Sequence, residues 1–508
     1  MLILSPVTLS AQVLTVALAV VLASAFVAIG GSIRRTLRAD KLLTPVPVPD
    51  GAFLLGCIPD VLRNLHRIYD YQAELLLKYG GRVRVPWSVF GGNVLYTSNP
   101  KDVEHMFSTN MDNYIKSSHF VASVGEIFDK TLFALNHAHT ADGGAMYKLQ
   151  RKTITRVFTA NNFREFTEGV FHKYALRTID VINTQGGKCE MHTIASQFTL
   201  QTIFDIGLGV SLESIDEDLG LKFVDSMDCV FLGIAARLMY KPYFKYFGWC
   251  MPSEYKLKRE SKVLLDLIDG IIKDRLAESD EQFQARSDIL TMCIKKGREL
   301  EAEGNTMVDI PTLRSSITGM LFGGRDTISS VILYAFYNLA QYPEQQDKLL
   351  EELETVDIAN LTYDDTLRLN PTAPLNTRQV AEDDVLPDGT FVPAGTDIII
   401  STYFMGRNNA ALWGEDLLVF RPERWFEMKK RPSAYEFPVF QAGPRICPGM
   451  NMALLEAKVF IAILLSEFHV KIQDGEQVKD RPYVLALAMM MKDGLPLQLT
   501  PRAAPFAS

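Results

Sequence analysis

The sequence predicts a mainly α-helical protein with small β-sheets set to one side, preceded by a membrane-spanning helix at the N-terminus. Three observations support this prediction. Residues 1–33 carry no charged side chain, and apolar residues lie almost all round a long predicted helix that begins near Pro311. Short runs rich in valine, isoleucine and threonine, separated by glycine-containing turns, fill residues 375–402. The chain has 508 residues and is 47% hydrophobic, so it can bury a large core.

The N-terminal segment 1–33 is predicted to be a membrane anchor. Its apolar centre has the length of about 20 residues that spans a bilayer as a helix. Four basic residues follow it directly: Arg34, Arg35, Arg38 and Lys41. Since a signal peptide carries its charge before the apolar run, the order favours an anchor, and the positive-inside rule places the following chain in the cytosol. A cleaved targeting peptide with an atypical order is the alternative.

Residues 34–50 are predicted to form a basic, proline-rich hinge between the anchor and a catalytic domain at 51–508. Pro45, Pro47 and Pro49 alternate in it. Each proline fixes its own φ and pushes the preceding residue toward an extended conformation, so the segment is a semi-rigid spacer.

Charge and cysteine content exclude several classes of protein. The net charge of −8 gives no reason to expect nucleic acid as a partner. The six cysteines are scattered and form no C-x-x-C pair, which is typical of a reducing compartment and not of a disulfide framework.

The long helix predicted over residues 311–342 contains the sequence GGRDT. Gly323, Gly324 and Thr327 share one face of it, and Asp326 lies beside the threonine. Glycine lets a flat or small group approach the backbone, so the face is interpreted as a groove for a small ligand with a proton route beside it. Close packing of a second helix against the glycines is an equally good interpretation.

The sequence FQAGPRICPG at 440–449 places Cys447 among glycine and proline beside Arg445. A nucleophilic cysteine needs a base, and the eight histidines lie far away in the sequence. A structural zinc site needs four closely spaced ligands, which are absent. A thiolate ligand to haem iron needs a flexible loop with N–H groups near sulfur, and Gly443 and Gly449 supply that freedom. A helix predicted over 451–465 directs its positive end toward the sulfur.

These motifs resemble those of the cytochrome P-450 superfamily. FQAGPRICPG resembles its F-x-x-G-x-R-x-C-x-G signature at every fixed position, GGRDT resembles its oxygen-binding motif, and FRPERW at 420–425 resembles its P-E-R-F segment. Residues 378–449 are most similar to eukaryotic long-chain fatty-acid and alkane hydroxylases. The resemblance implies the cytochrome P-450 fold.

The resemblance also implies a cofactor, heme b (iron protoporphyrin IX), and roles for individual residues. Cys447 is implied as the metal ligand on the proximal side of the iron, and Thr327 and Asp326 as the residues that deliver protons to bound dioxygen. Arg151 matches the arginine of the family's W-x-x-x-R motif, and Tyr147 stands where the family has tryptophan. The further implied haem contacts are Arg445, Arg378, Phe440, Gly443, Gly449, Gly323 and Gly324.

The implied function is hydroxylation of a lipid-like substrate, a fatty acid or an alkane, by a monooxygenase anchored in the endoplasmic reticulum membrane. Because the sequence has no flavin or nicotinamide fingerprint, electrons are expected from an NADPH-dependent cytochrome P-450 reductase. Two alternatives remain. One is a haem-thiolate enzyme that rearranges peroxides without a reductase, and Asp326 with Thr327 argues against it. The other is a non-catalytic or haem-poor member of the family.

The haem-poor alternative depends on one departure from the family pattern. The family's E-x-x-R motif matches Arg368, but the acid is Asp365, and the helix before it is short. We expect Asp365 to cap the helix or face water, which leaves Arg368 and Arg424 without a partner. A splice form or gene model lacking part of this helix explains the pattern, and a longer transcript would carry glutamate three residues before Arg368.

Two local expectations complete the prediction. His137 and His139 form an H-x-H pair, but no further ligands lie nearby, so a polar loop is the preferred interpretation over a metal site. The tail is interpreted as a β-hairpin that turns at residues 492–494, where Asp-Gly marks the turn.

Overall fold

The computed structural model describes residues 30, 46–51, 56–88, 92–128, 130–142, 144–158, 161–212, 217–239, 248–302, 309–355, 364–473, 482–484 and 486–502. The predicted anchor at 1–33, apart from residue 30, and most of the hinge at 34–50 lie outside these residues. Within the described ranges, no helix is both long enough and apolar enough to cross a membrane.

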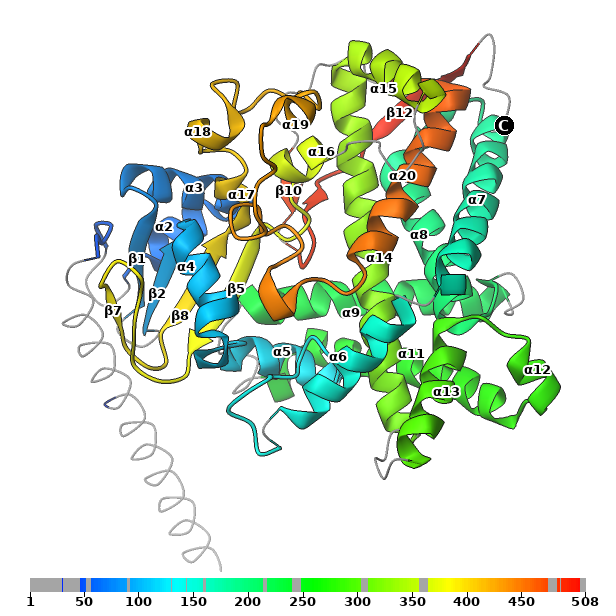
Figure 1. Cartoon of the computed structure of the whole chain (residues 1–508), viewed down its shortest axis with the longest axis horizontal. Coiled ribbons are helices and arrows are strands. Elements are labelled where there is room, and N and C mark those ends of the chain that lie inside the picture. The colour runs from blue at the N-terminus through cyan, green and yellow to red at the C-terminus, as the bar shows by residue number, and fades with distance from the viewer. Residues whose placement is uncertain are drawn as a thin grey trace, which may run out of the picture.

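The architecture is mainly helical, as predicted (Figure 1). The α-helices are α2 (Ile58–Arg63), α3 (Ile68–Lys78), α4 (Pro100–Glu104), α5 (Ser118–Phe128), α6 (Ala145–Phe158), α7 (Asn161–Thr184), α8 (Met191–Leu208), α9 (Glu217–Met239), α11 (Pro252–Ala277), α12 (Asp280–Gln284), α13 (Ile289–Ala302), α14 (Ile310–Gln341), α15 (Pro343–Thr355), α16 (Asp364–Leu369), α17 (Thr402–Met405), α18 (Ala410–Trp413), α19 (Arg424–Glu427) and α20 (Met450–Glu467). Short 3-10 turns are η1 (Leu65–Arg67), η3 (Met111–Asn113), η5 (Gly248–Cys250) and η7 (Gly443–Arg445), and η2 (His105–Thr109) is a π-helix.

The strands form small sheets, of which the largest lies on one side of the helical body, whereas β12 lies among the helices near α15 and α20, so the prediction of sheets set to one side holds only for part of them (Figure 1). The largest sheet has the order β1-β2-β8-β5-β3, in which β2 and β8 are parallel and the other neighbours antiparallel. The other sheets are β4-β12-β9, β10-β11 and β6-β7. The bounds are β1 (Arg82–Ser88), β2 (Gly92–Thr97), β3 (Tyr114–Ile115), β4 (Lys188–Glu190), β5 (Leu375–Val380), β6 (Asp384–Val385), β7 (Phe391–Val392), β8 (Asp397–Ser401), β9 (Phe468–Ile472), β10 (Tyr483–Val484), β11 (Met490–Met491) and β12 (Pro496–Pro501).

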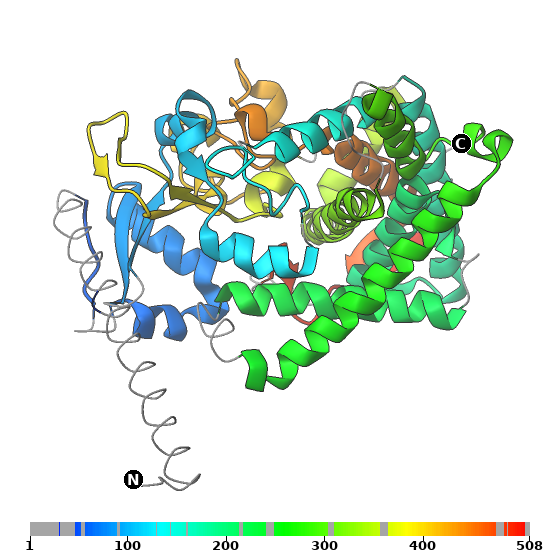
Figure 2. The same cartoon turned by 90° about the horizontal axis from the view of Figure 1, so that it is seen from below.

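Helix α14 is a long, mostly buried helix near the centre of the molecule. Asp309 caps it by accepting a hydrogen bond from the Thr312 N–H at 3.1 Å, Pro311 occupies its first turn, and it ends just before Pro343. It packs along α8, α11 and α20, and Figure 2 shows it nearly end-on near the centre of the molecule. The predicted core helix is therefore confirmed, and it carries the GGRDT sequence through the interior.

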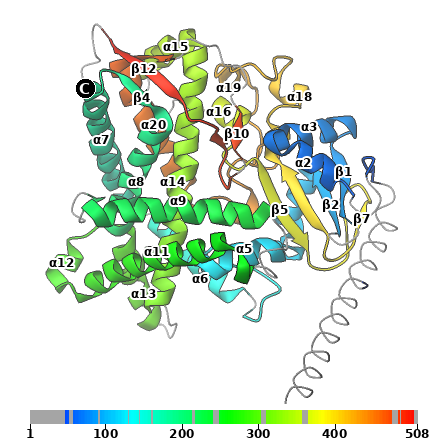
Figure 3. The same ribbon diagram turned by 180° about the vertical axis from the view of Figure 1, so that it is seen from behind.

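Helix α9 crosses α14 on the face seen in Figure 3. The contact is aromatic, since the ring centroids of Phe231 on α9 and Phe322 on α14 lie 4.8 Å apart. Phe322 also packs against Phe128 of α5 at 4.2 Å. These rings make the surroundings of the GGRDT segment strongly apolar.

The predicted C-terminal hairpin is wrong in its pairing. The turn itself is present, because Asp493 and Gly494 have φ values of 63° and 68°. The strand before the turn, β11, pairs with β10, whereas β12 after the turn pairs with β4 and β9. The sequence identified the turn but not the partners, because the pairing of β12 with the distant strands β4 and β9 leaves no local signal.

Candidate active site

The loop that ends at Cys447 is held by its own backbone. The Cys447 N–H donates to the Phe440 carbonyl oxygen at 2.8 Å. Gly443 has a φ of 57°, and a Cβ there would lie 2.2 Å from the Phe107 carbonyl oxygen, so only glycine fits. Gln441 also has a left-handed φ, of 62°. The loop is therefore a tight, specified turn that directs one cysteine inward.

The environment of the Cys447 thiol only partly favours the thiolate. Burial raises its pKa, while an N–H donor at Gly449 and the positive charge of Arg151 lower it. Arg151 of α6 also donates to the Ile446 carbonyl oxygen, next to the cysteine. The N-terminus of α20 begins three residues after Cys447. A cation bound to sulfur would complete the stabilisation of the thiolate.

Three cationic side chains share one interior region: Arg445, Arg378 and Lys116. Arg445 and Arg378 are 8% and 5% exposed. Burial and mutual repulsion lower the pKa of Lys116 far below its ordinary value, and they lower that of Arg378 to about 9. Burial, with a smaller effect of Arg151, also lowers the pKa of Arg445. Tyr147 opposes the lowering of the pKa at Arg378 and Arg445, and no carboxylate among the described residues raises the pKa of any of the three.

Neutral groups hold these cations in place. Arg378 donates to the Gln441 side-chain oxygen at 2.6 Å and stacks over the Phe107 ring at 4.4 Å. Lys116 donates to the Leu132 carbonyl oxygen at 2.6 Å. Lys116 and Gln441 are site residues that the sequence did not reveal, because neither occupies a fixed motif position. Two buried arginines with a partly buried lysine beside them, and no carboxylate paired with them among the described residues, fit a bound dianion.

His137 and Tyr147 complete this cluster around Arg445. The Arg445 guanidinium lies 4.4 Å from the centroid of the Tyr147 ring, and its Nε finds no hydrogen-bond partner among the residues that the structure describes. It donates to His137 Nδ1, while His137 Nε2 bonds the Met111 carbonyl oxygen at 2.9 Å. Burial and the nearby Arg445 charge lower the pKa of His137 to about 4, so it is neutral. The prediction of a polar loop missed this buried role, while the described residues hold no cluster of metal-ligating side chains.

In the GGRDT segment of α14, protein side chains face both glycines, as the close-packing interpretation predicts, and the groove for a ligand stays a prediction. Thr327 donates its hydroxyl to the Gly323 carbonyl oxygen at 2.6 Å. A Cβ at Gly323 would lie 3.1 Å from the Phe133 ring. A Cβ at Gly324 would lie 2.7 Å from Ile203 of α8, so close helix packing accounts for this glycine. Gly324 was predicted to contact the cofactor, and the contact that the structure shows is with α8.

Asp326 is a buried acid at the start of an ionic chain to the surface. Burial raises its pKa to about 6, and the nearby Arg325 charge opposes that rise. Arg325 Nε lies 3.6 Å from Asp326 Oδ1. Arg325 Nη1 bonds Asp228 of α9, whose side chain is 53% exposed. The carboxyl group can therefore exchange a proton near neutral pH.

The position of Asp365 contradicts the expectation that this residue would cap its helix or face water. Its side chain is fully buried, and it binds Arg368 Nε at 2.6 Å and Arg424 Nε at 2.9 Å. The Arg421 N–H donates to it at 2.7 Å, and the Trp425 indole N–H at 3.3 Å. The six-residue helix α16 suffices because the segment around Arg421 folds over it and brings these donors to the carboxylate.

The two arginines of this cluster are well held, which corrects the second part of that expectation. Arg368 donates to the carbonyl oxygens of Gly406 at 2.8 Å and Val419 at 3.0 Å. Arg424 donates to the Val419 carbonyl oxygen at 2.9 Å and to Asp416 at 3.1 Å. The segment between α15 and α16, where the predicted shortening falls, lies at 356–363 and outside the described residues.

Comparison with known proteins agrees with this geometry. The family profile described as Cytochrome P450 matches residues 46–497. The chain belongs to the cytochrome P450 family. Cytochrome P450 CYP94D109 of Paris polyphylla is 28% identical over 485 residues, covering 88% of this chain and 92% of the relative. Cytochrome P450 86B1 of Arabidopsis thaliana is 27% identical, with coverages of 88% and 85%. Cytochrome P450 704B1 of the same plant is 26% identical, with coverages of 89% and 94%.

Membership confirms the predicted enzyme class, because cytochromes P450 are haem-iron monooxygenases. The residues of this chain fit that group. Cys447 offers one sulfur ligand in a closed loop, and the unpaired cations around Arg445 and Arg378 match the two carboxylates of a haem. When bound through a thiolate, the haem activates dioxygen for O–O cleavage. In this chain, Cys447 and the cations around Arg445 and Arg378 would hold the haem, and Asp326 is a buried carboxyl group on α14 whose pKa burial raises to about 6.

Proposed function

We propose that this cytochrome P450 binds heme b and hydroxylates a lipid-like substrate, a fatty acid or an alkane, with dioxygen and two electrons from an NADPH-dependent reductase. The observation that supports heme b is the pairing of a single inward cysteine, Cys447, with buried cations that lack a carboxylate. We assign Cys447 to the iron and Arg445 and Arg378 to the propionates.

Proton delivery is assigned to Asp326 and Thr327. Asp326 has a pKa of about 6, so it can both give and regain a proton at cellular pH. Thr327 is the next residue of the helix after Asp326, and its hydroxyl donates to the Gly323 carbonyl oxygen. Replacing Thr327 with alanine is expected to keep the haem but to lower product per NADPH several-fold, since the hydroxyl no longer relays the proton. Unchanged coupling in a purified, reconstituted system would remove Thr327 from this role.

A lipid-like substrate is supported by the apolar surroundings of the GGRDT segment. Phe322 packs with Phe128 and Phe231 one residue before Gly323, and Phe133 faces Gly323 itself. Such rings favour a hydrocarbon over a polar substrate. The resemblance of residues 378–449 to long-chain fatty-acid and alkane hydroxylases supports the same substrate class.

We place the enzyme on the endoplasmic reticulum membrane, held by residues 1–33 through the hinge 34–50, with the catalytic domain in the cytosol. This assignment is supported by the uncharged, apolar N-terminal run and by the basic residues after it. Its test is protease protection of microsomes, in which the catalytic domain is digested from the outside and the anchor stays with the membrane.

The central test is a carbon-monoxide difference spectrum of the reduced full-length protein. We expect the thiolate band in the natural chain and its complete loss in Cys447→Ala, together with all turnover. A normal thiolate band in that variant would refute the assignment.

Laurate and hexadecane turnover with and without NADPH and reductase then tests the reaction. Product formed from a hydroperoxide without NADPH would favour the peroxide-rearranging alternative, and absence of haem would favour the haem-poor one.

A further inference from the structure

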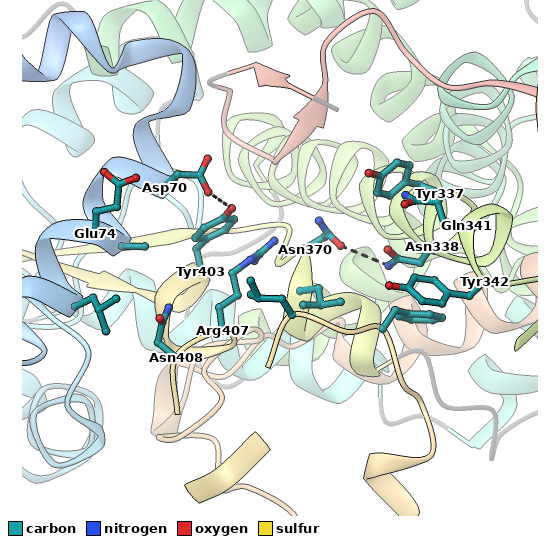
Figure 4. Close-up of a pocket in the computed structure, with 15 residues that line it drawn as sticks. Asp70, Glu74, Tyr337, Asn338, Gln341, Tyr342, Asn370, Tyr403, Arg407 and Asn408 are labelled. Carbon is teal, nitrogen blue, oxygen red and sulfur yellow. Dashed lines mark hydrogen bonds between the residues drawn. The ribbon is translucent and has the colours of Figure 1, made fainter. Parts of the chain in front are cut away.

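A second pocket lies between α3, the C-terminal end of α14 and the segment after β8 (Figure 4). Its volume of about 390 Å³ falls within the range of small-molecule sites. Its residue Asn338 is eleven positions, roughly 16 Å along the helix, from Thr327. Neither Cys447 nor the cations around Arg445 line it. The pocket is therefore separate from the haem site.

Arg407 is the unusual residue of this pocket. Its guanidinium lies 3.7 Å from the centroid of the Tyr403 ring, and its Nη1 has no hydrogen-bond partner within the described part of the chain. Among the residues that the structure describes, no carboxylate forms an ion pair with it, whereas Arg421 binds Asp416 and Glu427. A fixed guanidinium without an anion, on the wall of a pocket, indicates a site for one.

The position of Arg407 is set by a rigid chain of contacts. Tyr403 donates its hydroxyl to Asp70 at 2.5 Å, and Tyr483 donates to the same carboxylate at 3.0 Å. These bonds fix the ring on which the guanidinium stacks. Glu74, the other acid of the pocket, is bound by Arg67 at 2.5 Å. The acids on the α3 side are thus already engaged, and Figure 4 shows Arg407 between Tyr403 and Asn370.

The opposite wall offers amide donors and apolar rings. Asn338 Nδ2 makes only long contacts of 3.5 Å with Asn370 Oδ1 and Thr366 Oγ1, which leaves it donor capacity for a ligand. Beside these amides, the rings of Tyr342 and Phe420 lie 5.8 Å apart. The pocket therefore presents a cation and amides next to an aromatic surface.

We infer that this pocket binds a small carboxylate with a flat, apolar body. Arg407 takes the carboxylate, Asn338 and Asn370 donate to it, and Tyr342 and Phe420 hold the body. Arginine suits this ligand because its planar, forked donors match a carboxylate. The inference does not depend on the proposed substrate, because the two sites share no residue.

Photolabelling of the full-length haem protein tests the inference. The probe is 4-benzoylbenzoate, and neutral benzophenone is the matched control probe. We expect saturable labelling by 4-benzoylbenzoate of the peptides that contain Tyr403–Asn408 and Tyr337–Tyr342, and little from benzophenone. Arg407→Gln is expected to reduce this labelling at least about tenfold, since a charge-assisted hydrogen bond is lost. Equal labelling by both probes, or labelling unchanged in Arg407→Gln, would overturn the inference.

A second variant keeps the test decisive if Arg407→Gln does not fold. Leu418 lines the pocket and is 69% exposed, so Leu418→Trp adds a ring at the pocket without disturbing the core. The matched control is Leu62→Trp, at a leucine that is 62% exposed and not part of the lining. We expect loss of labelling only in Leu418→Trp, with the carbon-monoxide spectrum of both variants unchanged. Equal labelling of the two tryptophan variants would also contradict the inference.

Discussion

Two buried groups of arginines in this protein differ in how their charge is compensated. Arg368 and Arg424 surround Asp365, which binds both. Arg445 and Arg378 are held by neutral groups and aromatic rings, and no carboxylate of the described residues forms an ion pair with either. A buried charge without a partner is unstable unless something binds it. The first group therefore stabilises the fold, and the second is built to receive an external anion, which we assign to the haem.

Breaking the compensated group has the largest expected effect. Asp365→Asn keeps the shape but removes the charge between Arg368 and Arg424, so we expect a loss of about 3–5 kcal/mol in the free energy of unfolding. Urea unfolding measures it. The matched control is Asp364→Asn, because Asp364 pairs with Arg431, a side chain that is 60% exposed, and such pairs contribute about 0–1 kcal/mol. Equal losses of unfolding free energy in the two variants would mean that Asp365 is not needed to compensate the charges of Arg368 and Arg424.

We expect that removing a charge from the second group, Arg445 and Arg378, does not lower the free energy of unfolding of the haem-free protein. Arg378→Gln removes an uncompensated buried cation, so the apo protein is expected to be as stable as the natural chain or more stable. Haem affinity is expected to fall by about 1.5–3 kcal/mol, the contribution of a hydrogen bond to a charged group. Haem titration and unfolding of the apo protein separate the two effects. If Arg378→Gln destabilised the apo protein as strongly as Asp365→Asn, the contrast between the groups would be wrong.

Glu456 extends the comparison to an uncompensated acid. It is 1% exposed and bonded to the Thr202 hydroxyl, and burial raises its pKa to about 8. Because the folded-state pKa is raised, the protonated form contributes stability below about pH 4.5, the ordinary pKa of the group, and this contribution is lost as pH rises toward 8. Between pH 6 and 8 we expect the natural chain to lose about 2 kcal/mol more than Glu456→Gln. Parallel unfolding curves against pH would show that Glu456 ionises freely.

The chemistry of the site was largely visible in the sequence, because fixed spacings specify it. The loop around Cys447 needs glycine where its backbone approaches Phe107, and Gly443 is a fixed position of the sequence motif. The core helix could be predicted because apolar residues lie almost all round it and few of its residues are charged. The membrane anchor also depends on the sequence alone, since residues 1–33 lie almost entirely outside the described part of the chain.

Only the tertiary structure decided which partners the buried charges have. Asp365 lies in the first turn of a six-residue helix, a position that favours water, yet the segment carrying Arg421 and Trp425 folds over it. Lys116 and His137 join Arg445 from distant parts of the chain, and β11 and β12 join different sheets across one turn. The physical reason is the same in each case. Local propensity depends on a few neighbouring residues, whereas desolvation and ion pairing depend on groups that the chain brings together only when it folds.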